Sequence, residues 1–224
     1  MNRERPIPLV VLISGSGSNL QALIDAIREG HLPAEIRAVI SNRADAFGLE
    51  RARNAGIETR VLDHRAYSDR EAYDRDLAAL VEGFQPRLVI LAGFMRILTP
   101  AFVNRFHGRM LNIHPSLLPR YRGLHTHERV LEAGDREHGA SVHYVTEELD
   151  GGPVIMQARV PVEPGDDPET LAARVLGQEH VIYPAVIRLI AGNRVRLEEG
   201  GRVTFDGKPL ETPITLGWGE TPPR

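Results

Sequence analysis

The residues with the clearest chemical potential are an asparagine and a histidine in the stretch Leu111-Asn-Ile-His-Pro-Ser116. On a β-strand, Asn112 and His114 would point to the same face, because side chains alternate along a strand. An amide beside an imidazole suits carbonyl chemistry. The amide can donate to a developing oxyanion, and the imidazole can move a proton near neutral pH.

A carboxylate that could complete this pair is Asp150, in the stretch Leu149-Asp-Gly-Gly152. A flexible loop there could bring Asp150 to His114, hold the ring in place and favour its charged form. A plainer interpretation stays open, because Asn and His before a proline can close a turn and Asp-Gly is a common turn dipeptide. Spacing alone does not decide between the two.

Other catalytic and metal sites have weaker support. Ser116 lies only two residues from His114, and the chain has no Gly-x-Ser-x-Gly elbow, so a Ser-His-Asp triad is disfavoured. His125 and His127 would not share a helix face, and the nine histidines, with His138 and His143 among them, show no firm ligand spacing. We therefore expect no metal.

A glycine-rich segment, Gly15-Ser-Gly-Ser-Asn19, lies between a predicted strand and a predicted helix. Glycines let a backbone approach an anion, and a helix start offers free N–H groups. The segment lacks the lysine of a Walker loop, and Leu20 stands where a dinucleotide fingerprint needs a small residue. A single phosphate fits better, although a tight turn with an N-cap serine is the structural alternative.

Hydrophobic periodicity predicts the elements that must position these groups. Expected strands cover 9–13, 36–41, 59–62, 88–92, 110–113, 140–146, 154–162, 194–197 and 202–205. Expected helices cover 18 to about 30, 46–55, 69–84, 100–106, 125–133 and 167–190. The spacing of Ser18 and Gln21 predicts a capping box at the start of the first helix.

The alternation of strands and helices predicts a doubly wound α/β fold with a mostly parallel sheet. The strands at 140–146 and 154–162 have no room for a helix between them, which predicts one antiparallel strand. We expect residues 1–224 to form a single domain, with a core of about 9–190 and a small hairpin and tail at 191–224.

Composition excludes several classes of protein. The 224 residues are 42% hydrophobic and 25% charged, carry a net charge of −3 and include no cysteine. These values argue against disulfide scaffolds, thiolate metal sites and strongly basic nucleic-acid binders. Apolar stretches are too short to cross a bilayer, and the N-terminus shows no secretory signal. We expect a cytoplasmic protein, either a monomer or a homodimer.

Six motifs in one order strongly resemble the folate-dependent phosphoribosylglycinamide formyltransferase family of purine synthesis. They are Ile13-Ser-Gly-Ser-Gly-Ser-Asn-Leu-Gln-Ala22, Ser41-Asn-Arg-Ala-Asp-Ala46, Leu91-Ala-Gly-Phe-Met-Arg-Ile-Leu98, Leu111-Asn-Ile-His-Pro-Ser-Leu-Leu-Pro119, Gly123-Leu-His-Thr-His127 and Glu148-Leu-Asp-Gly-Gly-Pro-Val-Ile155. The resemblance runs from about residue 9 to about residue 190. It implies a Rossmann-like, three-layer formyltransferase fold and transfer of a formyl group from 10-formyltetrahydrofolate to the amine of N1-(5-phospho-D-ribosyl)glycinamide.

The resemblance also implies roles for individual residues. The catalytic positions match Asn112, His114 and Asp150. The positions that bind the phosphorylated substrate match Ser16, Gly17, Ser18, Asn19 and Glu179. The folate positions match Arg70, Met95, Arg96, Ile97, Leu98, Asn112, Thr146, Glu147, Glu148, Leu149 and Asp150. Two departures are Ser16, often Asn in the family, and Arg122, often Pro.

Three alternatives remain. A formyltetrahydrofolate hydrolase would use water as acceptor, but that group typically has an N-terminal regulatory domain, and here the first strand is expected near residue 9. A methionyl-tRNA formyltransferase would need a further C-terminal domain. A catalytically silent folate- or phosphate-binding module would not need Asn112, His114 and Asp150.

Overall fold

The computed structural model describes residues 5–224, so residues 1–4 of the predicted domain lie outside the described part. The chain divides into two compact units, and the boundary between them along the chain follows Asn112. Unit 1 extends to Asn112, and unit 2 runs from Ile113 to Arg224. Each unit is described by itself.

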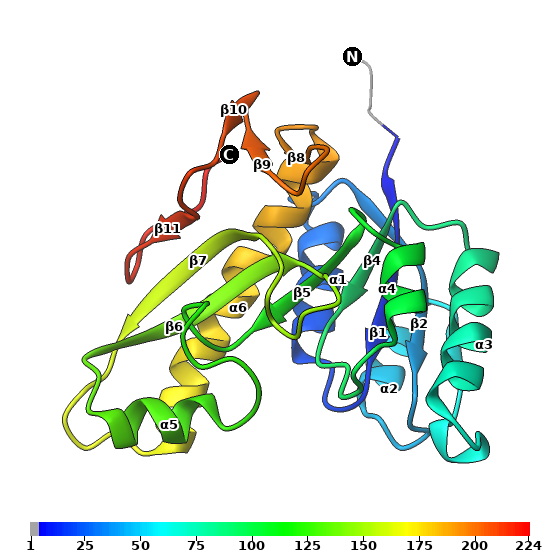
Figure 1. The fold of residues 1–224 in the computed structure, drawn as a ribbon, viewed down its shortest axis with the longest axis horizontal. Helices are drawn as coiled ribbons and strands as arrows, with labels where there is room; N and C mark the ends of the chain where they lie inside the picture. The colour runs from blue at the N-terminus through cyan, green and yellow to red at the C-terminus, as the bar shows by residue number, and fades with distance from the viewer. Residues whose placement is uncertain (1–4) are drawn as a thin grey trace. The chain divides into compact units, whose positions relative to one another are not determined.

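Unit 1 contains a parallel sheet whose strands follow the order β5-β4-β1-β2-β3 (Figure 1). The pairings of β1 with β2 and β4, of β2 with β3 and of β4 with β5 are all parallel. The strands are β1 (Ile7–Ile13), β2 (Ala34–Ser41), β3 (Thr59–Val61), β4 (Leu88–Leu91) and β5 (Met110–His114), the last of which continues into unit 2. Residues 9–13 are completely buried, as expected for a parallel strand covered on both faces.

Helices cover both faces of this sheet. They are α1 (Ser18–Arg28), α2 (Gly48–Asn54), α3 (Arg70–Gly83) and α4 (Pro100–Arg105), with a short 3-10 helix η1 (His64–Ala66). The chain steps outward from β1 to β3 through α1 and α2, then returns to β4 and β5 through α3 and α4. Right-handed crossovers therefore place the two pairs on opposite faces. The contacts of α1 with α2 and of α3 with α4 agree with this arrangement.

Unit 2 contains the antiparallel pair that the sequence predicts. Strands β6 (Glu137–Tyr144) and β7 (Val154–Pro161) are antiparallel, and β11 (Ile214–Leu216) adds to β7 in parallel. The long helix α6 (Pro168–Ala191) packs on both β6 and β7, and α5 (Thr126–Ala133) packs on α6. A capping box between Asp167 and Thr170 starts α6. The predicted fold class, a mostly parallel α/β sheet with flanking helices and an antiparallel pair, is confirmed.

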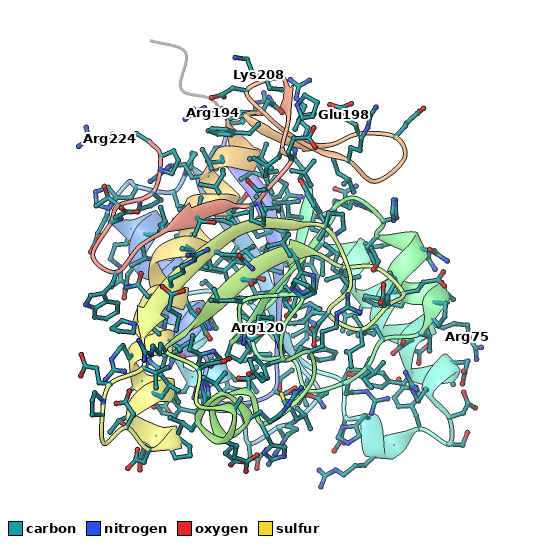
Figure 2. The ribbon with its side chains drawn as sticks, turned by 60° about the vertical axis from the view of Figure 1, so that its left-hand side comes forward. Arg75, Arg120, Arg194, Glu198, Lys208 and Arg224 are labelled. Atoms are coloured by element: carbon teal, nitrogen blue, oxygen red, sulfur yellow. The ribbon has the colours of Figure 1, made fainter. Side chains whose placement is uncertain are left out.

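The C-terminal part of unit 2 forms a second, small antiparallel sheet. Its strands are β8 (Val195–Leu197), β9 (Val203–Phe205) and β10 (Lys208–Pro209). Figure 2 shows Arg194, Glu198 and Lys208 around this sheet, and Arg194 forms an ion pair with Asp206 at 2.6 Å. The predicted hairpin is confirmed, whereas periodicity did not predict strands as short as β10 and β11.

One local prediction was wrong. Helix α1 does begin at Ser18, but its N-cap is Gly17 in the left-handed conformation (φ 71°), and no side chain of the described residues caps it. Ser18 is already helical, so its hydroxyl does not occupy the position from which a capping box forms. None of the helices within residues 5–224 is both long enough and apolar enough to span a membrane.

Candidate active site

His114 and Asp150 lie together in unit 2. Nδ1 of His114 is 3.5 Å from Oδ2 of Asp150, and each side chain is 8% exposed. The other ring nitrogen, Nε2, is 2.9 Å from the backbone oxygen of Tyr121. Both ring nitrogens therefore face oxygen acceptors. The ring can therefore donate a hydrogen bond from either nitrogen that carries a hydrogen.

The turn that presents Asp150 explains its Asp-Gly-Gly sequence. Asp150 adopts the left-handed conformation (φ 49°), which Asp tolerates better than most residues. Its Oδ2 also accepts a hydrogen bond of 2.9 Å from the backbone N–H of Gly123. A Cβ atom on Gly152 would lie 1.8 Å from the backbone oxygen of Tyr144, so only glycine fits there. Close packing of this turn on the end of β6 thus aims the carboxylate at His114.

Asn112 lies in β5, two residues before His114, and is half-buried. Alternation along the strand places the two side chains on the same side of β5, as the sequence predicts. Strand pairing fixes the backbone at this point, since Asn112 is in register with Leu91 of β4. A regular strand therefore carries both groups, and a rigid element positions functional side chains better than a loop does.

A second histidine near the carboxylate was missed as a site residue by the sequence analysis. Nε2 of His143 lies 3.9 Å from Oδ1 of Asp150, and Nδ1 lies 2.9 Å from the backbone oxygen of Tyr144. Burial lowers the pKa of His143, and this effect outweighs the attraction of Asp150. Its location became clear only from the fold, in which the turn after β6 brings Asp150 back to His143. The spacing of the two residues in the sequence does not predict this contact.

The loop after β5 is held by buried polar contacts. The hydroxyl of Ser116 donates to the backbone oxygen of Arg120 at 2.6 Å, so it supports the loop rather than a catalytic triad. Ser141 donates to the backbone oxygen of Ser116 at 2.7 Å, and Gln157 donates to the backbone oxygen of Leu118 at 2.8 Å. These contacts fix the segment that brings Tyr121 and Gly123 to His114 and Asp150.

The histidines of α5 and β6 form a pair of their own. Nδ1 of His127 lies 3.0 Å from Nε2 of His138, and His138 is almost completely buried. Burial lowers the pKa of both rings, that of His138 to about 4. His125 is exposed and lies 3.3 Å from Glu128. Within residues 5–224, no group of three His, Asp or Glu side chains could hold a metal ion.

The glycine-rich segment lies in unit 1, where it connects β1 to α1. Gly15 and Ser16 are exposed, Ser18 is half-buried, and Gly17 and Asn19 are buried. A Cβ atom on Gly17 would lie 2.5 Å from Cα of Gly48, and the N–H of Gly48 donates to the backbone oxygen of Gly15 at 3.0 Å. The start of α2 therefore shapes this loop, and the uncapped start of α1 suits an anion.

Arg51 of α2 is a further residue that the sequence analysis missed. Its Nε donates to the backbone oxygen of Ser16 at 2.8 Å, and its guanidinium stacks over the ring of Phe47. These contacts place a positive charge beside the loop while fixing its backbone. Arg51 is 35 residues away from Ser16 along the chain, so no local sequence motif predicts this contact.

The predicted folate residues of unit 1 lie together. Arg70, the first residue of α3, donates to the backbone oxygen of Ile97 at 2.5 Å. Arg96 stacks over the ring of Tyr73, 4.4 Å from its centroid. The side chains of Met95 and Ile97 are prominently exposed, at 66% and 60% of the residue surface. Leu98, next in the same loop, is half-buried.

The predicted substrate residues of unit 2 lie on two elements. Thr146, Glu147, Glu148 and Leu149 occupy the loop after β6 that leads to Asp150, and Leu149 is 52% exposed. Glu148 forms an ion pair with Arg122, so this departure from the family pattern connects the loop with the segment around Gly123. Glu179 is placed on α6 instead, where it is 7% exposed.

Comparison with known proteins places this site in a family. Residues 8–187 match the family model described as formyl transferase. The chain is 58% identical over 202 residues to phosphoribosylglycinamide formyltransferase of Escherichia coli (strain K12), covering 90% of this chain and 95% of that protein. It is 49% identical to the human trifunctional purine biosynthetic protein adenosine-3 over 88% of this chain and 20% of that protein.

Solved structures lead to the same family. The phosphoribosylglycinamide formyltransferase of Coxiella burnetii is 53% identical, with a TM-score of 0.90, and the match covers 94% of this chain and 99% of that one. Glycinamide ribonucleotide transformylase 1 from Symbiobacterium toebii is 47% identical, with a TM-score of 0.86 over 92% of this chain and 95% of that one. On these grounds, the chain belongs to the formyl transferase family.

Proposed function

We propose that this protein transfers the formyl group of 10-formyltetrahydrofolate to the amine of N1-(5-phospho-D-ribosyl)glycinamide, a step of purine (IMP) biosynthesis. The observation that carries the proposal is the buried contact of 3.5 Å between His114 and Asp150, in a chain of the formyl transferase family. The length and identity of the match with the Escherichia coli enzyme support this acceptor.

In the proposed reaction, Asn112 and His114 act on the formyl group. The substrate amine attacks the formyl carbon, which forms a new C–N bond and a tetrahedral oxyanion. Asn112 donates a hydrogen bond to that oxyanion, and a protonated His114, oriented by Asp150, stabilises the charge. When the bond to the folate nitrogen breaks, His114 supplies the proton that this nitrogen takes up. The attacking amine releases its own proton to water, and His114 takes a proton back from water, so the protons balance without a metal or a covalent enzyme intermediate.

The contacts of His114 suggest which ring nitrogen serves the substrate. Asp150 also accepts from Gly123 and thus has a fixed position. The Nε2 atom faces a neutral backbone oxygen, that of Tyr121. We propose that the reacting oxygen replaces this carbonyl at Nε2, while the carboxylate keeps hold of Nδ1. Exchange of a neutral acceptor for an oxyanion strengthens the hydrogen bond as charge develops.

The binding roles proposed here come from the resemblance to the family, and the uncapped start of α1 and the charges described above support them. The loop of Ser16, Gly17, Ser18 and Asn19 would bind the ribose phosphate through N–H groups and hydroxyls, with Arg51 adding positive charge. Glu179 would contact the glycinamide substrate. The folate would contact Asn112, Asp150 and the set Arg70, Met95, Arg96, Ile97, Leu98, Thr146, Glu147, Glu148 and Leu149.

One assay tests the reaction against its alternatives. The protein is mixed with 10-formyltetrahydrofolate and the ribonucleotide, and absorbance follows the deformylated folate. Signal only with the ribonucleotide supports the proposal. Equal signal without it identifies a hydrolase, and folate binding without any turnover identifies a binding module. We further propose that residues 1–224 act as one formyltransferase domain in the cytoplasm, as a monomer or homodimer, two states that the elution volume in gel filtration would distinguish.

A further inference from the structure

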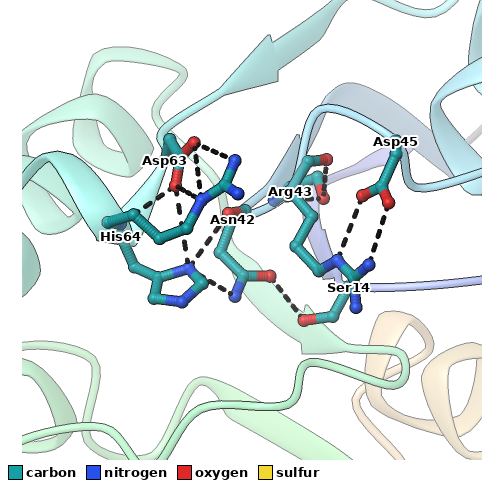
Figure 3. Close-up of polar contacts among 8 residues, drawn as sticks. Ser14, Asn42, Arg43, Asp45, Asp63 and His64 are labelled. Carbon is teal, nitrogen blue, oxygen red and sulfur yellow. Dashed lines mark hydrogen bonds and ion pairs between the residues drawn. The ribbon is translucent and has the colours of Figure 1, made fainter.

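Three polar side chains of unit 1 have no part in the proposed chemistry, yet they lie in contact with one another. Ser14 follows β1, Asn42 follows β2, and His64 begins η1 (Figure 3). Ser14 is 4% exposed and Asn42 is 3% exposed. Buried polar groups of this kind need hydrogen-bond partners, so their arrangement has a structural cause.

The hydrogen bonds among these residues run in one direction. The backbone N–H of Met95 donates to Oγ of Ser14 at 2.8 Å, and the Ser14 hydroxyl donates to Oδ1 of Asn42 at 2.6 Å. The amide oxygen of Asn42 thus faces Ser14 and accepts its single hydroxyl hydrogen. The Nδ2 group of Asn42 then faces Nδ1 of His64, 3.2 Å away.

This direction favours one tautomer of His64. Nδ2 of Asn42 can only donate, so the contact is a hydrogen bond when Nδ1 of His64 accepts and the ring hydrogen is on Nε2. An Nδ1 that carried a hydrogen would instead donate to the backbone oxygen of Asn42, also 3.2 Å away, and would leave two donors facing each other. Asp63, whose Oδ1 lies 4.0 Å from Nδ1, bonds with Arg65.

The hydrogen-bonded chain ends at the loop to which the proposed function assigns folate. Ser14 holds this loop twice, because its backbone N–H also donates to the oxygen of Gly93 at 3.1 Å. Contacts from α3 hold the other end of the loop: Arg70 donates to Ile97, and the N–H of Thr99 donates to Asp74 at 2.6 Å. The loop backbone is thus fixed from both sides.

We infer that Asn42, acting through Ser14 and supported by His64, is a positioning residue that fixes the Met95 backbone for the formyl folate. The inference rests on the proposed function for the identity of the ligand. None of the three side chains needs to touch the substrate. Loss of Asn42 would leave the Ser14 hydroxyl free to rotate, and the Met95 N–H would lose a fixed acceptor.

The test uses Asn42→Ala in the full chain with two kinds of measurement. Hydrogen exchange of the Met95 amide should become about tenfold faster, since a typical hydrogen bond contributes on the order of a tenfold equilibrium effect. The Kd and KM for 10-formyltetrahydrofolate should rise about fivefold to tenfold by the same argument. The KM for the ribonucleotide and kcat should stay within about twofold. Asp45→Ala, which removes only the exposed pairing with Arg43 shown in Figure 3, is the matched control.

Substitution of His64 provides a second, milder test, because this side chain is 32% exposed. His64→Leu removes the acceptor for Asn42 and should raise the Kd for formyl folate. His64→Gln supplies an amide oxygen that can accept from Nδ2 and should restore the Kd, an outcome that a purely space-filling role would not produce.

Several outcomes would overturn the inference. Unchanged Met95 exchange in Asn42→Ala would show that the chain of hydrogen bonds does not hold the loop. An equal rise of both KM values would indicate general damage, as would His64→Gln behaving like His64→Leu. Absence of formyl transfer in the unaltered protein would reject the proposed function instead. Hydrogen exchange of the Met95 amide and the Kd for 10-formyltetrahydrofolate would still test the role of Asn42, since neither measurement requires turnover.

Discussion

Nδ1 of His114 lies 3.5 Å from Oδ2 of Asp150, although the two residues come from different elements and each side chain is only 8% exposed. One is the last residue of β5, and the other belongs to the turn between β6 and β7. Burial strengthens electrostatic contacts because solvent screening is weak. In the proposed function, this carboxylate orients the ring and stabilises a positive charge on it.

Replacing the charge of Asp150 should impair turnover more than binding. Asp150→Asn keeps an oxygen that can accept from Gly123 but removes the negative charge beside His114. We expect kcat to fall at least about 100-fold, the lower range for loss of acid–base function, with both KM values within about threefold. Steady-state absorbance assays measure this. Glu137→Gln, an exposed carboxylate on β6, is the control and should retain normal kcat, whereas near-normal kcat in Asp150→Asn would remove Asp150 from the mechanism.

Removing the amide of Asn112 should also act on kcat. Loss of one donor to a developing oxyanion costs about 2.7–4 kcal/mol, or roughly 100-fold to 1000-fold in rate. Asn112→Ala should show this loss while substrate binding persists, and single-turnover kinetics would separate the two effects. Asn104→Ala, at an exposed position of α4, is the matched substitution without an expected effect. A change in KM without a change in kcat would contradict the proposal that Asn112 stabilises the oxyanion.

Ser18→Ala should affect only the phosphorylated substrate. The Ser18 hydroxyl lies in the first turn of α1, beside the exposed backbone of the loop. Loss of one hydrogen bond to a charged group should raise the KM for the ribonucleotide roughly tenfold. Unphosphorylated ribosylglycinamide provides the control, because its KM should be the same for both proteins. An equal rise of its KM would show that Ser18 does not bind the phosphate.

Two glycines allow the cost of an unfavourable backbone conformation to be measured separately from the cost of a close contact. The measured quantity is the free energy of unfolding. Gly17 and Gly30 both have positive φ values, 71° and 76°. A Cβ atom on Gly17 would lie 2.5 Å from Gly48, whereas one on Gly30 would meet nothing within 4 Å. Gly30→Ala should cost about 1–2 kcal/mol of unfolding free energy from conformation alone. Gly17→Ala should cost distinctly more in urea unfolding, and equal losses would show that the contact with Gly48 is easily relieved.

The buried histidine pair should make stability depend on pH. Burial lowers the pKa of His138 in the folded protein from 6.5 to about 4, so between these values the unfolded chain binds more protons. The contribution of neutral His138 to the free energy of unfolding is present near pH 7 and is lost as the pH falls from 6.5 to about 4. A tenfold change in proton affinity corresponds to about 1.4 kcal/mol, so the loss of unfolding free energy approaches about 3 kcal/mol.

His138→Gln should remove most of this dependence, as measured by urea unfolding at pH 7 and near pH 4. His31→Gln is the control, because His31 is 70% exposed and should leave the difference between the two pH values unchanged. If His138→Gln and the unaltered protein lost the same stability on acidification, the neutral pair would not be the cause.

The sequence alone determined the longer elements, the fold class and the order of the motifs. Buried runs such as 9–13 and the helical spacing before Gly30 place β1 and α1 within a few residues, because periodicity reflects which faces are buried. The position of Asn112 and His114 on one face of β5 follows from strand geometry alone. The substrates were predicted from the resemblance of the six motifs to a known family. The spacing of the candidate catalytic residues did not predict them.

Tertiary structure decided which distant residues meet. The contacts of His143 with Asp150, of Arg51 with Ser16 and of Asn42 with His64 join segments separated along the chain, and no local pattern encodes such distances. His64 in particular belongs to none of the motifs or elements that the sequence predicts. Its contact with Asn42 arises only because the fold brings the end of β2 next to η1. Local periodicity reports burial, whereas the direction of a hydrogen bond depends on the three-dimensional position of both partners.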